Sequence, residues 1–176
     1  MTGYMKKLIL GVLTMGMLLS ACRESEQAVN SDLTGNQTVY SLQAGSTYNI
    51  SGTVTFKEKK DGTALIDLAL TGTDGTAEFP VHLHMGNIAA PDAAVAALLN
   101  PVQGKSGASE TNLLQLADES KVTYAQLLQL NACVKVHLGA TGPDRDIILA
   151  AGNIGQAAST DGLSSGRLGI SVCKSE

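Results

Sequence analysis

The residues best suited to chemistry in this chain are its histidines. The 176 residues include only three, and two of them form the sequence His82-Leu83-His84. Side chains on a strand alternate between its two faces, so both imidazoles would project from the same face. The third, His137, ends a second strand-like run and can add a ligand from a neighbouring strand. Three imidazole nitrogens close together suit copper or zinc. The alternative for His82 and His84 is a pair of surface or capping histidines bonded to the backbone.

The same pattern carries two further expectations. A metal bound by imidazoles competes with protons, so binding should weaken as the pH falls through about 6.5. Met85 follows His84 directly and would point to the opposite face of a regular strand, where core packing is its expected role. The chain contains no GxSxG, Walker or HExxH motif. Asp144 and Asp146 flank Arg145 in a Gly-Pro turn, which a solvated loop explains better than a pair of acid–base carboxylates.

Strands must position these histidines, and most of the chain shows the alternation typical of strands. The runs that predict strands are residues 47–57, 63–71, 79–85, 112–116, 133–138, 147–154 and 167–173. Residues 93–99 fit a short helix or a buried strand. Thr123 is a suitable cap for a helix over residues 124–130. Seven short strands separated by turns predict an all-β fold, an antiparallel β-sandwich with one or two short helices.

The first residues have the features of an export signal. Lys6 and Lys7 precede an uncharged, mostly apolar run, which ends at Leu19-Ser20-Ala21-Cys22. The run is about 12 residues long, whereas a permanent membrane span needs about 20. The tetrapeptide resembles the lipobox of bacterial lipoproteins, and this resemblance implies that residues 1–21 are removed and that Cys22 is lipidated. Position 23 is arginine rather than the aspartate linked to inner-membrane retention, so an outer-membrane lipoprotein of the cell envelope is expected, with its domain in the periplasm or at the cell surface.

The rest of the chain is expected to form one exported domain. Without Lys6 and Lys7, 10 Lys and Arg oppose 16 Asp and Glu, a formal charge of −6 that argues against a nucleic-acid partner. The polar composition predicts a flexible tether at residues 22–44 and a folded domain at residues 45–176. Because lipidation uses Cys22, the remaining Cys133 and Cys173 are expected to form a disulfide. Closing this loop would stabilise the fold by roughly 4 kcal/mol.

Several segments together resemble a CHRD domain, a repeat named after chordin and common in exported bacterial proteins. They are Phe79-Pro80-Val81-His82-Leu83-His84-Met85-Gly86, Leu98-Leu99-Asn100-Pro101-Val102, Gln126-Leu127-Leu128, Val134-Lys135-Val136-His137 and Gly152-Asn153-Ile154-Gly155. The resemblance covers roughly residues 45–156. It implies an immunoglobulin-like β-sandwich related in architecture to Cu,Zn superoxide dismutase.

Comparison with the dismutase implies a copper site without its zinc neighbour. His82 and His84 are similar to its HVH copper ligands, and His137 is similar to the later copper histidine. The histidine that bridges the two metals is replaced by Leu98, and the chain has no further histidine for zinc. The resemblance therefore implies at most three copper ligands.

These observations favour a non-enzymatic binding or structural module that is attached to the membrane through Cys22. Copper held by His82, His84 and His137 is its candidate cofactor, and its protein or small-molecule partner is undefined. The alternative is a copper-only, dismutase-like enzyme. The net negative charge and the lack of an arginine clearly placed to attract an anion weigh against that alternative.

Overall fold

The computed structural model describes residues 32–90, 93–161 and 170, and its main elements are eight strands. Their bounds are β1 Leu33–Ala44, β2 Ser51–Lys59, β3 Ala64–Thr71, β4 Glu78–Met85, β5 Val95–Gln103, β6 Ala108–Leu113, β7 Asn131–His137 and β8 Ile148–Ile154. The short helices are α1 Tyr124–Leu127, the 3-10 turn η1 Gly142–Asp146 and α2 Gly155–Asp161. The all-β prediction is therefore confirmed, and every strand pair is antiparallel.

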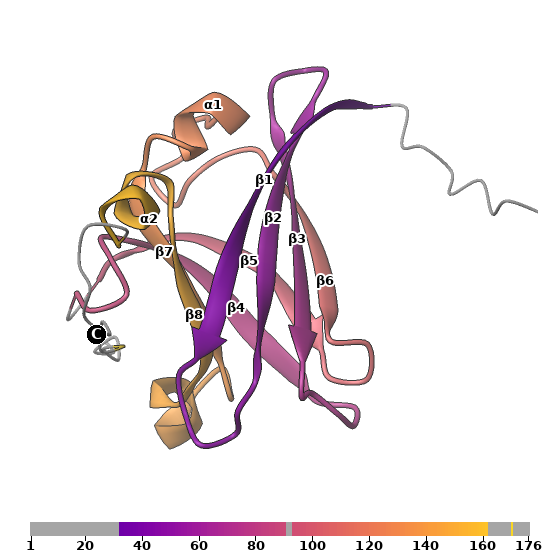
Figure 1. Cartoon of the computed structure of the whole chain (residues 1–176), viewed down its shortest axis with the longest axis vertical. Coiled ribbons are helices and arrows are strands. Elements are labelled where there is room, and N and C mark those ends of the chain that lie inside the picture. The colour runs from indigo at the N-terminus through magenta and orange to yellow at the C-terminus, as the bar shows by residue number, and fades with distance from the viewer. Residues whose placement is uncertain (1–31, 91–92, 162–169, 171–176) are drawn as a thin grey trace, which may run out of the picture. The chain divides into compact units, whose positions relative to one another are not determined.

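The strands close into one barrel in the order β1-β2-β3-β6-β5-β4-β7-β8 (Figure 1). Consecutive strands pair as hairpins except where the chain crosses from β3 to β4 and from β6 to β7. Strand β3 thus lies beside β6, and β7 lies beside β4, which is the arrangement of two Greek keys. The second crossing brings two strands that are distant in sequence side by side, and these two strands carry the three histidines.

Hydrogen bonds link the strands all the way round, so the strands form a closed barrel rather than the explicit sandwich that was expected. Two of the links are short. Strands β5 and β6 share the single pair Gln103 and Ala108, and β1 meets β8 only at Gln43 and Ala44. Sequence patterning that separates inner from outer residues is the same for a sandwich and a barrel, so it does not reveal such seams.

The folded region begins earlier than predicted. Strand β1 occupies residues that were assigned to a flexible tether, and it pairs with β2 from Leu33 to Leu42. Most of its side chains are exposed and only Leu42 is fully buried. The segment is therefore polar enough to resemble a linker, although its backbone is bonded into the barrel.

Other element boundaries also differ from the predictions. The ambiguous run at residues 93–99 lies mostly in strand β5, not in a helix. Strand β6 begins before the predicted strand at residues 112–116 and overlaps it only at Asn112 and Leu113. Helix α1 is short, and Thr123 caps it as predicted, with Gln126 completing a capping box. Met85 is 41% exposed at the end of β4, so its predicted role in core packing is wrong.

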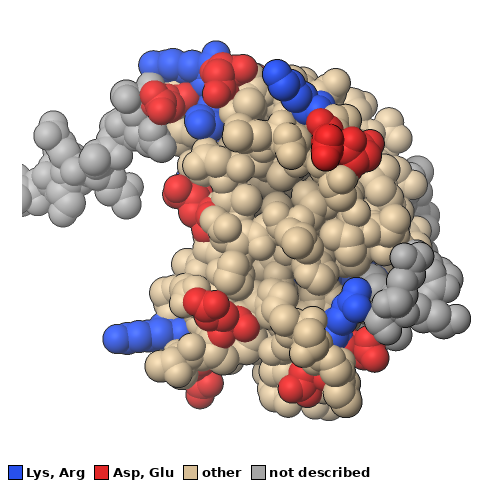
Figure 2. Space-filling view, turned by 180° about the vertical axis from the view of Figure 1, so that it is seen from behind, with Lys and Arg blue, Asp and Glu red and all other residues tan. Residues whose placement is uncertain are grey.

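The barrel interior is filled by apolar side chains from all eight strands. Representative members with no exposed surface are Val54, Phe56, Leu83, Val134 and Leu149. The charged residues lie elsewhere: on the face seen in Figure 2, acidic and basic side chains are interspersed, mostly around the periphery. Within the described ranges, no helix is both long and apolar enough to cross a membrane.

Several predictions concern residues outside the described ranges. These are the signal segment at residues 1–21, the lipidated Cys22, the first part of the tether and most of the strand at residues 167–173. Cys133 is buried in β7, whereas Cys173 lies outside the described residues. The disulfide between Cys133 and Cys173 therefore stays a prediction.

Substitution of Gly152 should destabilise the seam between β8 and β1. A Cβ atom at this position would lie 2.1 Å from the backbone oxygen of Ser41, which is too close for any rotamer change to relieve. We expect Gly152→Ala to lower the free energy of unfolding by about 1–3 kcal/mol, the usual cost of overpacking. Urea unfolding would measure this loss. An unchanged midpoint would show that β1 and β8 do not approach as closely as described.

Candidate metal centre

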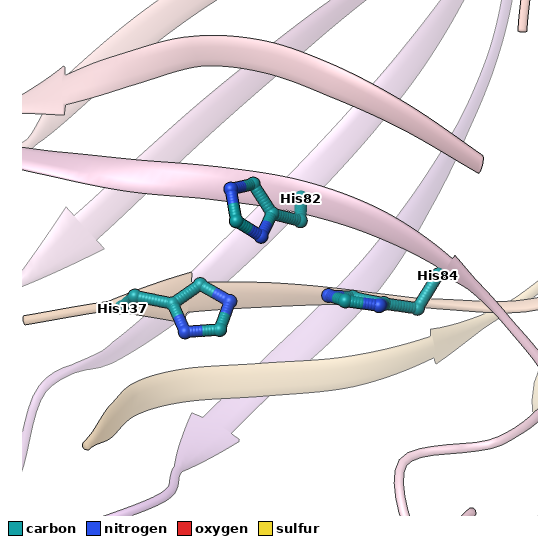
Figure 3. A group of neighbouring side chains, drawn as sticks. All are labelled: His82, His84 and His137. Atoms are coloured by element: carbon teal, nitrogen blue, oxygen red, sulfur yellow. The ribbon is translucent and has the colours of Figure 1, made fainter. Parts of the chain in front are cut away.

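The three histidines lie on the outer face of the barrel wall. In β4, Val81 and Leu83 face the core, and the intervening His82 and the following His84 face outward. In β7, Val134 and Val136 likewise belong to the core cluster, which leaves His137 on the outer face. Strands β4 and β7 are hydrogen-bonded neighbours, so all three imidazoles share one surface (Figure 3).

The imidazoles converge closely enough to share an ion. The ring centroids of His82 and His137 are 4.6 Å apart, and those of His84 lie 5.6 Å from His82 and 6.1 Å from His137. One nitrogen from each ring lies within 4.8 Å of the others. Two nitrogens on opposite sides of a metal would be about 4 Å apart, because each bond is about 2 Å long. Small ring rotations therefore complete the coordination geometry.

Backbone carbonyls fix the orientation of two of the rings. Nδ1 of His84 lies 2.8 Å from the oxygen of Ala93, and Nδ1 of His137 lies 2.6 Å from the oxygen of Arg145. A carbonyl oxygen only accepts, so each Nδ1 must carry the proton and donate it. In the neutral ring, Nε2 then presents its lone pair. Metal-binding histidines are held by the same kind of bond from their second nitrogen.

The Nε2 atom of His137 is the clearest sign of a ligand site. It is buried and has no hydrogen-bond partner among the described residues. Burying such a group without a partner costs about 1–3 kcal/mol, so unpaired ring nitrogens need an explanation. A metal ion between the three rings supplies one, and the donor set fits copper or zinc.

Register shifts in two strand ladders help to orient the His84 and His137 side chains. The β4–β5 ladder shifts register between Leu83 and His84, and the β7–β8 ladder shifts between Val136 and His137. Such bulges bend a strand and redirect a side chain, and they are common beside functional sites. Loops cover the rings from outside, because Ala93 precedes β5 and Arg145 belongs to η1. His84 and His137 are consequently 0% and 1% exposed, whereas His82 is half-buried.

Burial keeps the three imidazoles neutral. Burial first, and then the neighbouring imidazoles and the charge of Arg145, lower the pKa of His82 to about 4. Burial also lowers the pKa of His84 to about 4, although its bond to Ala93 opposes the shift. The pKa of His137 is lowered by burial against the opposing effect of its bond to Arg145. The ligands therefore require no deprotonation at neutral pH, and the expected loss of metal binding moves from about pH 6.5 towards pH 4.

These shifts predict how the stability of the metal-free chain depends on pH. The unfolded histidines titrate near 6.5 and the folded ones at lower pH, so only the unfolded state gains protons between these values. Stability should be complete above about pH 6.5 and fall as the pH drops towards 4, with a slope of up to about 1.4 kcal/mol per pH unit from His84. Urea unfolding from pH 4 to 7 measures the slope. The variant His84→Asn keeps a donor for Ala93 and should flatten the curve, whereas stability that rises as the pH falls would contradict the account.

The structure also assigns neighbours that the sequence patterns missed. Asn153 on β8 accepts a hydrogen bond from the backbone of Ile88 at 2.7 Å, and this bond holds the loop that supplies the carbonyl of Ala93. Lys135 lies opposite His82 in the β4–β7 ladder. Arg145, which was expected to be a solvated loop residue, is half-buried and bonded to His137 through its backbone. No spacing rule reveals these contacts, because they depend on loops that fold back over the sheet.

Next to the cluster, the surface contains a pocket of about 320 Å³. His82 forms part of its wall, together with Leu98, Pro101 and Ala140. Leu98 lies directly opposite His82 in the β4–β5 ladder and is 71% exposed. The position that would hold a bridging histidine in the dismutase is thus beside the cluster, but its side chain offers no donor. His82 is the ligand through which the cluster meets solvent.

The fold and site define an antiparallel eight-stranded barrel with a three-histidine cluster on its outer wall. Searches for similar proteins found no matching family model, no matching curated protein and no matching solved structure. The resemblance to CHRD domains therefore rests on the sequence segments alone.

Proposed function

We propose that this chain is a copper-binding module of the bacterial cell envelope, with a CHRD-like domain that binds copper through His82, His84 and His137. The observation that carries the proposal is the buried Nε2 of His137, which has no hydrogen-bond partner in the described part of the chain and lies near two other imidazoles. The Nδ1–carbonyl bonds and the lowered pKa values support it, because they present neutral rings in a fixed orientation. Copper is favoured over zinc because nitrogen ligands bind it more tightly.

The burial of the site favours a protein that binds copper without catalysing a reaction. His84 and His137 have almost no exposed surface, so the ion would be shielded on two sides. Structural zinc sites use four protein ligands, whereas the described metal-binding group contains three histidines. Titration of the purified, metal-free chain with copper tests the proposal. We expect one equivalent to bind per chain, and the absence of saturable binding would overturn the proposal.

A copper-only, dismutase-like enzyme is the second candidate, and the position of Arg145 favours it. The charge of this residue contributes, after burial, to the lowered pKa of all three histidines, so it acts at the cluster. The sequence patterns did not single out this arginine. A positive charge near the cluster would attract a small anion. Bound copper would supply one-electron redox chemistry, and dismutase assays of the copper-loaded chain distinguish the two candidates.

The proposed location depends on the lipid anchor. We expect Cys22→Ala to abolish lipidation, because the lipid would be attached through the Cys22 sulfur. Incorporation of labelled palmitate by cells that express the chain measures this, with fractionation to assign the outer membrane. The variant Cys173→Ala is the matched control and should keep the label. Label in Cys22→Ala would show that this cysteine is not the anchor.

A further inference from the structure

Lys135 is an unusual neighbour for a cation site, because it is a lysine with 0% exposure. It lies on β7 between core residues Val134 and Val136, so its side chain shares the outer face with His137. Directly opposite it in the β4–β7 ladder is His82. Opposed residues of an antiparallel pair have Cβ atoms about 5 Å apart. Lys135 therefore lies on the same outer face of the barrel wall as the proposed ligands.

Arg145 places a second positive charge at the cluster. Its carbonyl oxygen accepts the hydrogen bond from Nδ1 of His137 at 2.6 Å, which fixes its backbone next to the ring. The charges of both Lys135 and Arg145 act on His84 and on His137, where they add to the effect of burial in lowering the pKa. The negative charge of the exposed Asp146 opposes this effect on His137, because it raises the pKa of that ring. Three neutral imidazoles contribute no negative charge of their own.

The positive charges of Lys135 and Arg145 weaken the binding of a cation more strongly as the charge of the cation increases. Around two fixed cations, a divalent ion is repelled about twice as strongly as a monovalent one. The donor set acts in the same direction, because cupric ions prefer a square-planar or tetragonal set of ligands and the cluster offers three nitrogens. Removing one of these cations should change the balance by about tenfold or more at the dielectric of a partly buried site.

We propose that Lys135 and Arg145 make the three-histidine site selective for the monovalent cuprous ion over the divalent cupric ion. This inference rests on the proposed copper-binding function and specifies the oxidation state that the chain holds. It assigns Lys135 the role of a specificity-determining residue that acts through its positive charge. The half-buried His82 beside the 320 Å³ pocket is then the side from which the cuprous ion enters.

Competition with chromophoric chelators tests the inference on the purified chain. Cuprous affinity is measured without oxygen in the presence of a reductant, and cupric affinity is measured in air. We expect the native chain to bind the cuprous ion more tightly. Lys135→Met and Arg145→Met should each reduce the ratio of cuprous to cupric affinity by about tenfold, mainly by strengthening cupric binding. The variant Lys105→Met removes an exposed lysine from the turn between β5 and β6 and should leave the ratio within about twofold.

The two variants guard against a folding failure. Arg145→Met changes only a half-buried side chain and keeps the carbonyl that orients His137, so it decides the question if Lys135→Met does not fold. Copper binding by the native chain with an unchanged ratio in the folded variants would overturn this inference and leave the proposed function intact. So would tighter binding of the cupric ion by the native chain. A chain that binds neither ion would overturn both.

Discussion

Replacing His137 by alanine should lower the affinity of the chain for copper by at least about a hundredfold. Its Nε2 is buried without a partner among the described residues, and its ring lies 4.6 Å from that of His82 and 6.1 Å from that of His84 between centroids. Loss of a residue that merely orients a ligand costs about 10–100-fold in metal affinity, so loss of a ligand should cost more. Copper titration with a competing chelator measures the change.

The control for this experiment lies next to the cluster. Leu98 is opposite His82 on the neighbouring strand and is largely exposed, so Leu98→Ala alters the surroundings without removing a donor. Its copper affinity should stay within about threefold of the native value, since surface substitutions change free energies by about 0.5 kcal/mol or less. Equal losses in His137→Ala and Leu98→Ala would show that the effect is not ligation. Native affinity in His137→Ala would exclude His137 as a ligand.

Replacing Leu83 by alanine should destabilise the fold by about 2–5 kcal/mol, although it removes no ligand. Leu83 stands between His82 and His84 in sequence, but its side chain points into the barrel core and is 0% exposed. The substitution leaves a cavity behind the wall that carries the site. Urea unfolding measures the loss, and the exposed Leu98→Ala variant should change stability by less than about 0.5 kcal/mol.

Comparison of Leu83→Ala with Leu98→Ala tests whether side chains of strand β4 alternate between the core and the outer face. If Leu83→Ala unfolded at the native urea concentration, Leu83 would not face the core, and the two histidines would not share the outer face. A large loss in Leu98→Ala would likewise place Leu98 inside. The expected contrast requires the strand to turn alternate side chains inward and outward.

The convergence of the histidines could be predicted because it depends on the period of a strand. His82 and His84 are two residues apart, which places them on one face wherever that strand lies. That His137 would join them was a weaker prediction, since it depends on β7 crossing over to lie beside β4. The carbonyl bonds and the positions of Lys135 and Arg145 could not be predicted, because they arise from loops and from cross-strand register.

The fold was predictable to the level of its class. Alternating apolar residues identified most of the strands, because burial of one face dictates the pattern. Strand β1 was not predicted, because its outward residues are polar and only Leu42 is fully buried. The closure of the barrel could not be predicted either. Strands β5 and β6 share one residue pair and β1 and β8 share two, and such short pairings do not change the hydrophobic pattern.

The central claim is that His82, His84 and His137 bind one copper ion together. A crystal structure of the copper-loaded chain tests it most directly. We expect one ion bound to a nitrogen of each of the three rings at about 2 Å, with Nδ1 of His84 and of His137 still donating to the carbonyls of Ala93 and Arg145. Copper bound elsewhere on the chain, or three rings left in place with no ion between them, would contradict it.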